Sequence, residues 1–497
     1  MPFAFSPLRR RFSITVGLAV IAALVVTMLA AANVALTQVS ADPYTNSASQ
    51  HATELEPDTF ANGGTVVSTF QVGRFFNGGA TNIGFVRSGD GGTTWDAPGF
   101  LPGMTFSSGA ASSPYERVSD PSVAYDAAHG VWLISSIPLT PNTSVPTVFV
   151  NRSTDDGRTW GNPISIPPPV SHRVDLDKNW TACDNHAGSP FYGHCYTEFD
   201  NFADGDKELM STSTDGGVTW GVPLETAGHD KGLGGQPVVQ PSGRVVVPFE
   251  SLNGTISSFV SDDGGASWSK AVTVSHVRFH GVAGNLRTSP LPSAEIAGDG
   301  TVYVAWEDCR FRKKCTSNDI VFSTSTDGAA WTDTARVPID DVTSSVDHFI
   351  PGLAVDPATS GAGTHLALTY YFYPDATCTG GCQLDVGYIS SPDGGAHWGA
   401  ATQLAGPMTL DQIAQTSQGP MVGDYISTSF SGGLATTVIA VGKPATTAAF
   451  DEAMYAPASR LSVATAAQAT NPSTTAGVAA PITGEGTGET HRALKND

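Results

Sequence analysis

Four arginines and four acidic or phenolic residues lie where the chain could bring them to one end of a β structure. The arginines are Arg74, Arg117, Arg287 and Arg310, and the others are Asp120, Glu250, Tyr371 and Tyr425. Each lies near the start or the end of an apolar segment that predicts a strand. Only 25 of the 497 residues are Lys or Arg, so several arginines at such positions suggest a pocket for an anion. A guanidinium group suits this task because it is always charged and donates in a planar fork.

A short pattern, Ser-x-Asp-x-Gly-x-x-Trp, occurs six times and indicates how these residues are positioned. In each copy the Asp can accept N–H bonds across its own turn, the Gly supplies a positive φ, and the Trp offers an apolar face to the next strand. The fifth copy is one residue shorter between Asp and Trp. The copies begin at Ser88, Ser153, Ser213, Ser261, Ser325 and Ser391, and their tryptophans are Trp95, Trp160, Trp220, Trp268, Trp331 and Trp398.

A second repeat precedes each copy of this pattern. It consists of an apolar segment that begins near a Pro or a charged residue, a Gly-rich turn and a second apolar segment. Seven such hairpins can be counted, against six copies of the first pattern. A unit repeated at intervals of this length is typical of a solenoid, a propeller or an array. The pattern therefore predicts an all-β chain of repeated units, with seven units favoured and six as the alternative.

The first pattern is the Asp-box, or bacterial neuraminidase repeat, and the chain resembles the sialidase superfamily of β-propellers over residues 54–458. The resemblance implies four-stranded blades with each box on the turn between the third and fourth strands. It also implies that the boxes lie on the face away from the active site.

The resemblance implies roles for the candidate residues. Sialidases bind the sugar carboxylate with three arginines, for which the best placements are Arg74, Arg287 and Arg310, with Arg117 as a further candidate. They use a Tyr–Glu nucleophile because a carboxylate would repel the anionic sugar, which implies Glu250 with Tyr371 or Tyr425. Asp120 would be the general acid. The Arg-Ile-Pro motif of sialidases is absent, since Glu54-Leu-Glu-Pro57 stands at the first inner strand and Arg117-Val-Ser-Asp-Pro121 at the second.

The two ends of the chain differ in composition from its middle. Residues 1–41 contain three arginines, a long apolar stretch and small residues before Asp42, which predicts a secretory signal. The apolar stretch is long enough that an uncleaved membrane anchor stays open. Residues 42–53 are interpreted as a linker, and the Ala-, Thr-, Gly- and Pro-rich residues 459–497 as a disordered tail.

The six cysteines form three pairs that are close in sequence: Cys183 and Cys195, Cys309 and Cys315, and Cys378 and Cys382. Fifteen pairings are possible, and proximity favours these three. No pair has histidines at metal-ligand spacing. The cysteines therefore predict three disulfides and an oxidising, extracellular location.

The formal net charge is −21, which excludes binding to nucleic acid through the overall field of the protein. The sequence contains no metal motif and no nucleotide-binding loop, so we expect no cofactor. Two functions fit. The first is a secreted sialidase-like glycoside hydrolase that releases terminal sialic acid or another acidic sugar. The alternative is a non-catalytic extracellular propeller that binds a glycan or a protein, because a fold does not dictate function.

Overall fold

Antiparallel β-strands dominate the structure, a computed structural model that describes residues 1, 34–446 and 449–468. The helical elements in these residues are four 3₁₀ turns of three residues each. The described residues from Val34 onward belong to one compact unit. The predicted all-β class is confirmed.

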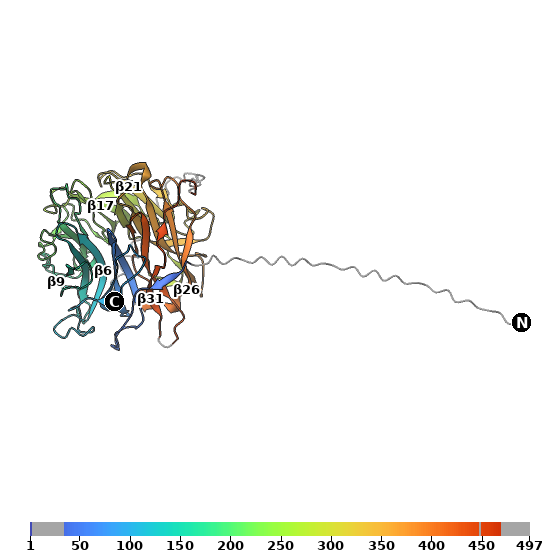
Figure 1. The fold of residues 1–497 in the computed structure, drawn as a ribbon, viewed down its shortest axis with the longest axis horizontal. Helices are drawn as coiled ribbons and strands as arrows, with labels where there is room; N and C mark the ends of the chain where they lie inside the picture. Colours follow the sequence, from blue (N-terminus) through green and yellow to red (C-terminus); the bar gives the residue numbers. More distant parts are fainter. Residues whose placement is uncertain (2–33, 447–448, 469–497) are drawn as a thin grey trace. The chain divides into compact units, whose positions relative to one another are not determined.

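Successive strands pair in groups that usually contain four strands in chain order, and the pairing of Ala80 with Val118 joins the first two groups into one eight-stranded sheet. Figure 1 shows the groups following one another from β6 and β9 through β17 and β21 to β26 and β31. The first six groups are β2–β5 (Glu54–Asn62, Thr65–Arg74, Ala80–Ser88, Gly99–Phe100), β6–β9 (Arg117–Asp126, Val131–Leu139, Phe149–Ser153, Ile164–Ser165), β10–β13 (Leu176–Cys183, Cys195–Asn201, Lys207–Ser213, Leu224–Glu225), β14–β18 (Gly232–Leu233, Val238–Val239, Val245–Ser251, Thr255–Ser261, Val272–His276), β19–β22 (Ser293–Ile296, Val302–Asp308, Asp319–Ser325, Ala335–Arg336) and β23–β26 (Asp347–Val355, Leu366–Tyr373, Gln383–Ser391, Thr402–Thr409).

A further sheet combines strands from both ends of the described chain. Its order is β29 (Ser427–Ser431), β30 (Leu434–Gly442), β31 (Glu452–Pro457) and β1 (Leu36–Gln38). A small hairpin, β27–β28 (Ala414–Thr416 and Gly419–Met421), precedes it.

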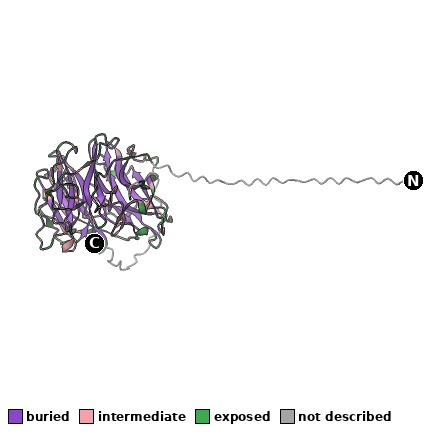
Figure 2. Ribbon diagram, turned by 90° about the horizontal axis from the view of Figure 1, so that it is seen from below, coloured by how far each residue is buried: buried purple, intermediate pink, exposed green. Residues whose placement is uncertain are grey.

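The first strands of neighbouring groups contact one another. Such contacts join β2 to β6, β6 to β10, β10 to β15, β15 to β19, β19 to β23 and β23 to β29, and β29 in turn contacts β2. Hydroxyl groups contribute to the last contact, since Thr59 Oγ1 lies 2.9 Å from Ser427 Oγ. The apolar core lies between the sheets, and Figure 2 shows that buried residues follow the strands.

Each Asp-box begins at the last residue of the strand that pairs with the outermost strand of its group, as the resemblance implied. In the first box the Ser88 hydroxyl donates to Asp90 Oδ1 (2.8 Å), which also accepts the backbone N–H of Thr94 (2.8 Å). The hydroxyl of Thr94 donates to the other carboxylate oxygen (2.7 Å), and this bond lowers the pKa of Asp90 to about 2. Gly91 has a φ of 75°. The boxes are therefore corners fixed by local hydrogen bonds.

Both predicted end segments lie partly outside the described residues, and the structure describes the rest as ordered. Leu36–Gln38, inside the predicted signal, pairs with β31, and Val39 is buried. Leu461–Ser462 (β32), inside the predicted tail, pairs with β30. Residues 2–33 and 469–497 are not described. Within the described residues, no helix has the length and apolar character needed to cross a membrane.

All three predicted cysteine pairs are bonded: Cys183 to Cys195, Cys309 to Cys315, and Cys378 to Cys382. The first bond joins β10 to β11, so it links paired neighbouring strands.

Candidate functional site

Three neighbouring first strands contain the same irregularity near their beginnings. The pairing register shifts in β2 between Leu55 and Asp58, in β6 between Ser119 and Ser122, and in β10 between Asp177 and Trp180. Within these shifts, a charged residue adopts left-handed backbone: Glu56 at φ 60°, Asp120 at φ 49° and Lys178 at φ 53°. Left-handed backbone costs free energy for residues other than Gly, and bulges often redirect side chains beside functional sites.

These bulges bring the three charged side chains together. Lys178 Nζ donates to Asp424 Oδ2 and lies 3.4 Å from Asp120 Oδ1 and 3.8 Å from Glu56 Oε1. Arg287 reaches the same group from the segment between β18 and β19, and its Nε and a terminal nitrogen bind both oxygens of Asp424. Two cations therefore hold Asp424, while Asp120 and Glu56 share Lys178.

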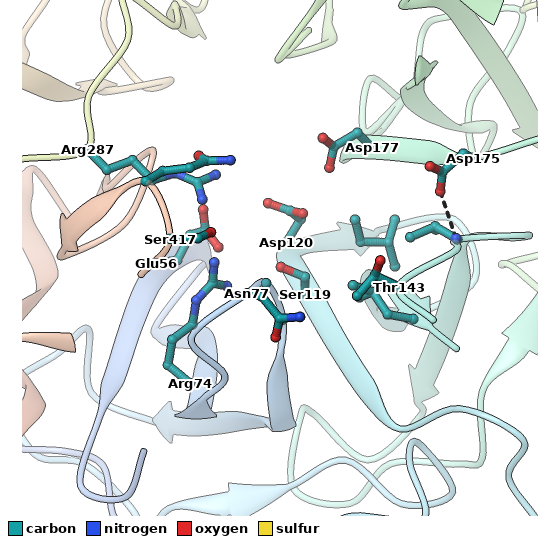
Figure 3. A pocket seen from close by; sticks show the side chains of 16 residues that line it. Glu56, Arg74, Asn77, Ser119, Asp120, Thr143, Asp175, Asp177, Arg287 and Ser417 are labelled. Carbon is teal, nitrogen blue, oxygen red and sulfur yellow. Dashed lines mark hydrogen bonds between the residues drawn. The ribbon is translucent and has the colours of Figure 1, made fainter. Parts of the chain in front are cut away.

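A cavity with about 670 Å³ of empty space, part of it open solvent, lies beside this cluster. Glu56, Asp120 and Arg287 contribute to its lining (Figure 3), whereas Lys178 is not among the lining residues. The lining residues are Glu56, Arg74, Asn77, Gly78, Gly79, Ser119, Asp120, Ile137, Leu139, Thr143, Val145, Asp175, Asp177, Arg287, Ser417 and Gln418.

Arg74, the last residue of β3, is 2% exposed and extends into this lining. One terminal nitrogen donates to Gln71 Oε1 (2.7 Å), and Gln71 in turn donates to Glu56 and to Ser119 Oγ. The Nε atom of Arg74 is buried and has no hydrogen-bond partner among the described residues. A buried donor without a partner is costly. Arg74 is also among the residues that line the cavity, so another part of its side chain can meet a ligand there.

The carboxyl groups of the cluster have different protonation tendencies. Burial raises the pKa of Glu56 to about 7, assisted by the charge of Asp120 and opposed by Lys178. Burial also raises the pKa of Asp120. Burial would raise the pKa of Asp424 too, but the charges of Arg287 and Lys178 hold it well below its usual range. Environments that separate the pKa values of neighbouring carboxyl groups are typical of acid–base chemistry.

Three of the eight candidate residues meet at the cavity: Arg74, Arg287 and Asp120. Arg117 lies close by, since it donates to the lining residue Asn77 (2.6 Å) and its guanidinium stacks over Phe75.

The other four candidates are not among the described residues that line the cavity. The Tyr371 hydroxyl donates to Ala440 O (2.9 Å) inside the core. The Tyr425 hydroxyl donates to Pro121 O (3.1 Å), and its ring packs against Trp180. Glu250 is buried on β16. Arg310 binds Asp308, two residues away in sequence, and Thr334.

The sequence analysis did not select Glu56 or Lys178. Their sequence positions could have indicated them. Glu56 and Asp120 each precede a Pro at the start of a predicted inner strand, and Lys178 follows Asp177 at the start of the next one. The left-handed backbone at these positions turns side chains that would otherwise follow the strand.

A second cluster has residue types that could bind a metal ion. Ligand atoms of Asp319, Asp340 and His348 lie within 4.8 Å of one another. However, Arg312 lies 2.6 Å from both carboxylates, and Arg336 contacts both as well. Two guanidinium groups thus already balance these charges, which disfavours a cation there.

Residues 79–280 match a family described as BNR repeat-like domain. No curated protein matches the chain. Among solved structures, a protein of unknown function from Dyadobacter fermentans is 17% identical, with 72% of this chain and 99% of that chain covered and a TM-score of 0.44.

Two sialidase structures are also similar. The NanB sialidase from Streptococcus pneumoniae is 13% identical, covering 86% of this chain and 71% of that chain, with a TM-score of 0.40. The intramolecular trans-sialidase from Ruminococcus gnavus is 13% identical, covering 84% and 96%, also with a TM-score of 0.40. The repeat match and the six boxes therefore indicate a BNR repeat-like domain over residues 79–280.

Proposed function

We propose that the sheets close into a seven-bladed propeller and that the cavity at Arg74 is the active site of an extracellular glycoside hydrolase that removes a terminal acidic sugar. The contact between β2 and β29 supports closure. The pairing of β1 with β31 supplies the last sheet with an outermost strand, which supports seven blades over six. The three disulfides support an extracellular location.

The observation that carries the enzymatic proposal is the position of Arg74 in the lining of the cavity together with two carboxyl groups of raised pKa, Glu56 and Asp120. In this proposal Arg74 binds the sugar carboxylate, with Arg287 adding positive charge to the same wall. Asp120 is the general acid that protonates the leaving oxygen, and Glu56 is the base that activates water. A pair of carboxyl groups in these two roles is a common scheme for glycoside hydrolysis. It suits this cavity because no tyrosine is among the described residues that line it.

That missing tyrosine also favours a second candidate, a non-catalytic propeller that binds acidic glycans in the same cavity. The two functions share the arginines and differ in what Asp120 does. A hydrolase requires its proton, whereas a binding protein does not.

The test is release of the fluorophore from a 4-methylumbelliferyl α-sialoside and from the corresponding β-glucuronide. The purified protein should cleave at least one of them, Asp120→Asn should reduce kcat by about 100-fold or more, and Arg74→Met should chiefly raise KM. Arg310→Met is the matched control, because Arg310 binds Asp308 and Thr334 and is not among the cavity-lining residues; its activity should equal that of the wild type. Turnover that survives Asp120→Asn would remove Asp120 from the mechanism. Binding of the sugars without cleavage would establish the second candidate instead.

A further inference from the structure

The residues just before Asp42 form the outermost strand of the last sheet. In this strand, β1, the antiparallel register places Leu36 opposite Pro457 and Gln38 opposite Tyr455 of β31. The Tyr455 hydroxyl also donates to Gln38 Oε1 (3.1 Å), so a side-chain bond accompanies the backbone pairing. Without β1, the strand β31 would be the edge of this sheet and would present a row of unpaired backbone groups.

Two further residues fix this strand to the core. Val39 is buried and donates its backbone N–H to Met454 O (2.9 Å). Ser40 is buried too, and its hydroxyl donates to Glu54 Oε2 (2.8 Å) and accepts the backbone N–H of Met454 (2.8 Å). Both backbone groups of the buried Met454 are therefore bonded to this segment. Removal of the segment would leave them without these partners, and unsatisfied buried groups are costly.

The contacts continue upstream to the beginning of the described part of this segment. Ala35 O accepts the backbone N–H of Ala458 (2.8 Å), and Val34 and Leu36 pack against the hydrophobic core. A leader that is removed during maturation contributes nothing to the folded product. Because the residues from Val34 onward belong to the folded product, the end of a leader is expected before Val34.

Two places in the sequence match the small-residue cleavage site of a secretory leader. One is Val39-Ser40-Ala41, directly before Asp42, and the other is Ala30-Ala31-Ala32, directly before Asn33. Secretory signals typically extend over about 15–30 residues. A leader that ends at Ala32 is closer to this length than one that ends at Ala41. Sequence and structure therefore favour the same, earlier site.

We propose that a signal peptidase removes the leader between Ala32 and Asn33, so that the mature chain keeps the strand that completes the last sheet. The reaction hydrolyses one peptide bond with one water molecule and leaves a carboxylate on Ala32 and an ammonium group on Asn33. A cut after Ala41 would instead release β1, Val39 and Ser40 together. The proposal concerns maturation and is independent of the activity proposed above.

The test is the N-terminus of the protein that a bacterial host exports when it expresses the full chain. Edman sequencing and intact mass should show a chain that begins at Asn33. Ala32→Phe places a bulky residue at the cleavage position and should abolish this cut. The matched control Ala41→Phe should leave the N-terminus at Asn33, and Ala41 is exposed in the folded domain, so the substitution has room.

A synthetic peptide of residues 20–46, incubated with purified signal peptidase in detergent, tests the same bond without export or folding. Cleavage directly before Asn33 is expected. An exported chain that begins at Asp42 would overturn the inference, and so would a protein that retains its leader. A peptide cut only after Ala41, or not at all, would also overturn it. An Asn33 terminus that persists in Ala32→Phe would assign the cut to another protease and refute the proposed site.

Discussion

Replacement of Lys178 by Met tests the charged cluster beside the cavity. Methionine retains the apolar stem of the side chain and removes the ammonium group, which contacts Asp424, Asp120 and Glu56. The four side chains are between 1% and 5% exposed, so water cannot replace the lost cation. Removal of one partner from a buried ion pair costs about 3–5 kcal/mol of unfolding free energy. Because Arg287 still pairs with Asp424 in the variant, we expect the free energy of unfolding to fall by about 3 kcal/mol at pH 8, near the lower end of that range.

The loss should depend on pH in a definite direction. The pKa of Glu56 in the folded protein is about 7, above its usual 4.5, so its protonation stabilises the folded state and this stabilisation is lost as the pH rises through 7. Lys178 lowers that pKa, and the variant should therefore lose stability more steeply over the same interval. At pH 5 Glu56 is protonated and needs no cation. The cost of Lys178→Met should thus be smaller at pH 5 than at pH 8.

Guanidinium chloride unfolding of both proteins at the two pH values measures this difference. Arg244→Met is the control, because Arg244 pairs with Asp262 at the surface and such pairs contribute about 1 kcal/mol or less. The reasoning is refuted if Lys178→Met costs no more than this control at pH 8, or if its cost is the same at both pH values.

Three further predictions concern stability. Burial raises the pKa of Glu250 to about 8, so this group loses its stabilising protonation as the pH rises through 8. In urea unfolding, the free energy of unfolding of Glu250→Gln should therefore equal that of the wild type at pH 5 and be higher by on the order of 3 kcal/mol at pH 9. Equal stability of the two proteins at pH 9 would contradict this. A chain that begins at Asp42 lacks β1 and the buried Val39, and should unfold about 2–3 kcal/mol more easily than one that begins at Val34; denaturation midpoints that coincide would argue against a structural role for β1. Simultaneous replacement of Cys183 and Cys195 by Ser opens a loop with a sequence separation of 12. It should lower the free energy of unfolding by about 3 kcal/mol. An unchanged melting temperature in calorimetry would contradict this.

Much of the fold could be predicted because its signals are local. In a box, the bonds that hold the corner join residues at most five positions apart, such as Ser88, Asp90 and Thr94, so the sequence pattern contains the whole interaction. The disulfides follow the same rule, since each closes a short loop. By contrast, the pairing of β1 with β31 joins residues more than 400 positions apart, and no local pattern in Leu36–Gln38 indicates it.

The candidate site was predictable only in part for a related reason. Arg74, Arg287 and Asp120 were selected from their positions at strand ends, and the structure brings them to one cavity. Strand ends alone do not distinguish them from Arg310, whose guanidinium binds a carboxylate two residues away. Glu56 and Lys178 depend on bulges, and the direction that a bulge gives to a side chain is not contained in strand periodicity.

The left-handed residues of the three bulges set backbone strain against charge pairing. Glycine adopts such backbone freely, whereas Glu56, Asp120 and Lys178 each hold it at a cost of about 1–3 kcal/mol. Glycine at these positions would relieve this strain but would remove the charged side chains of the cluster. At Lys178 it would also leave Asp120 and Glu56 without the cation that they share, at a cost of about 3–5 kcal/mol that exceeds the strain relieved.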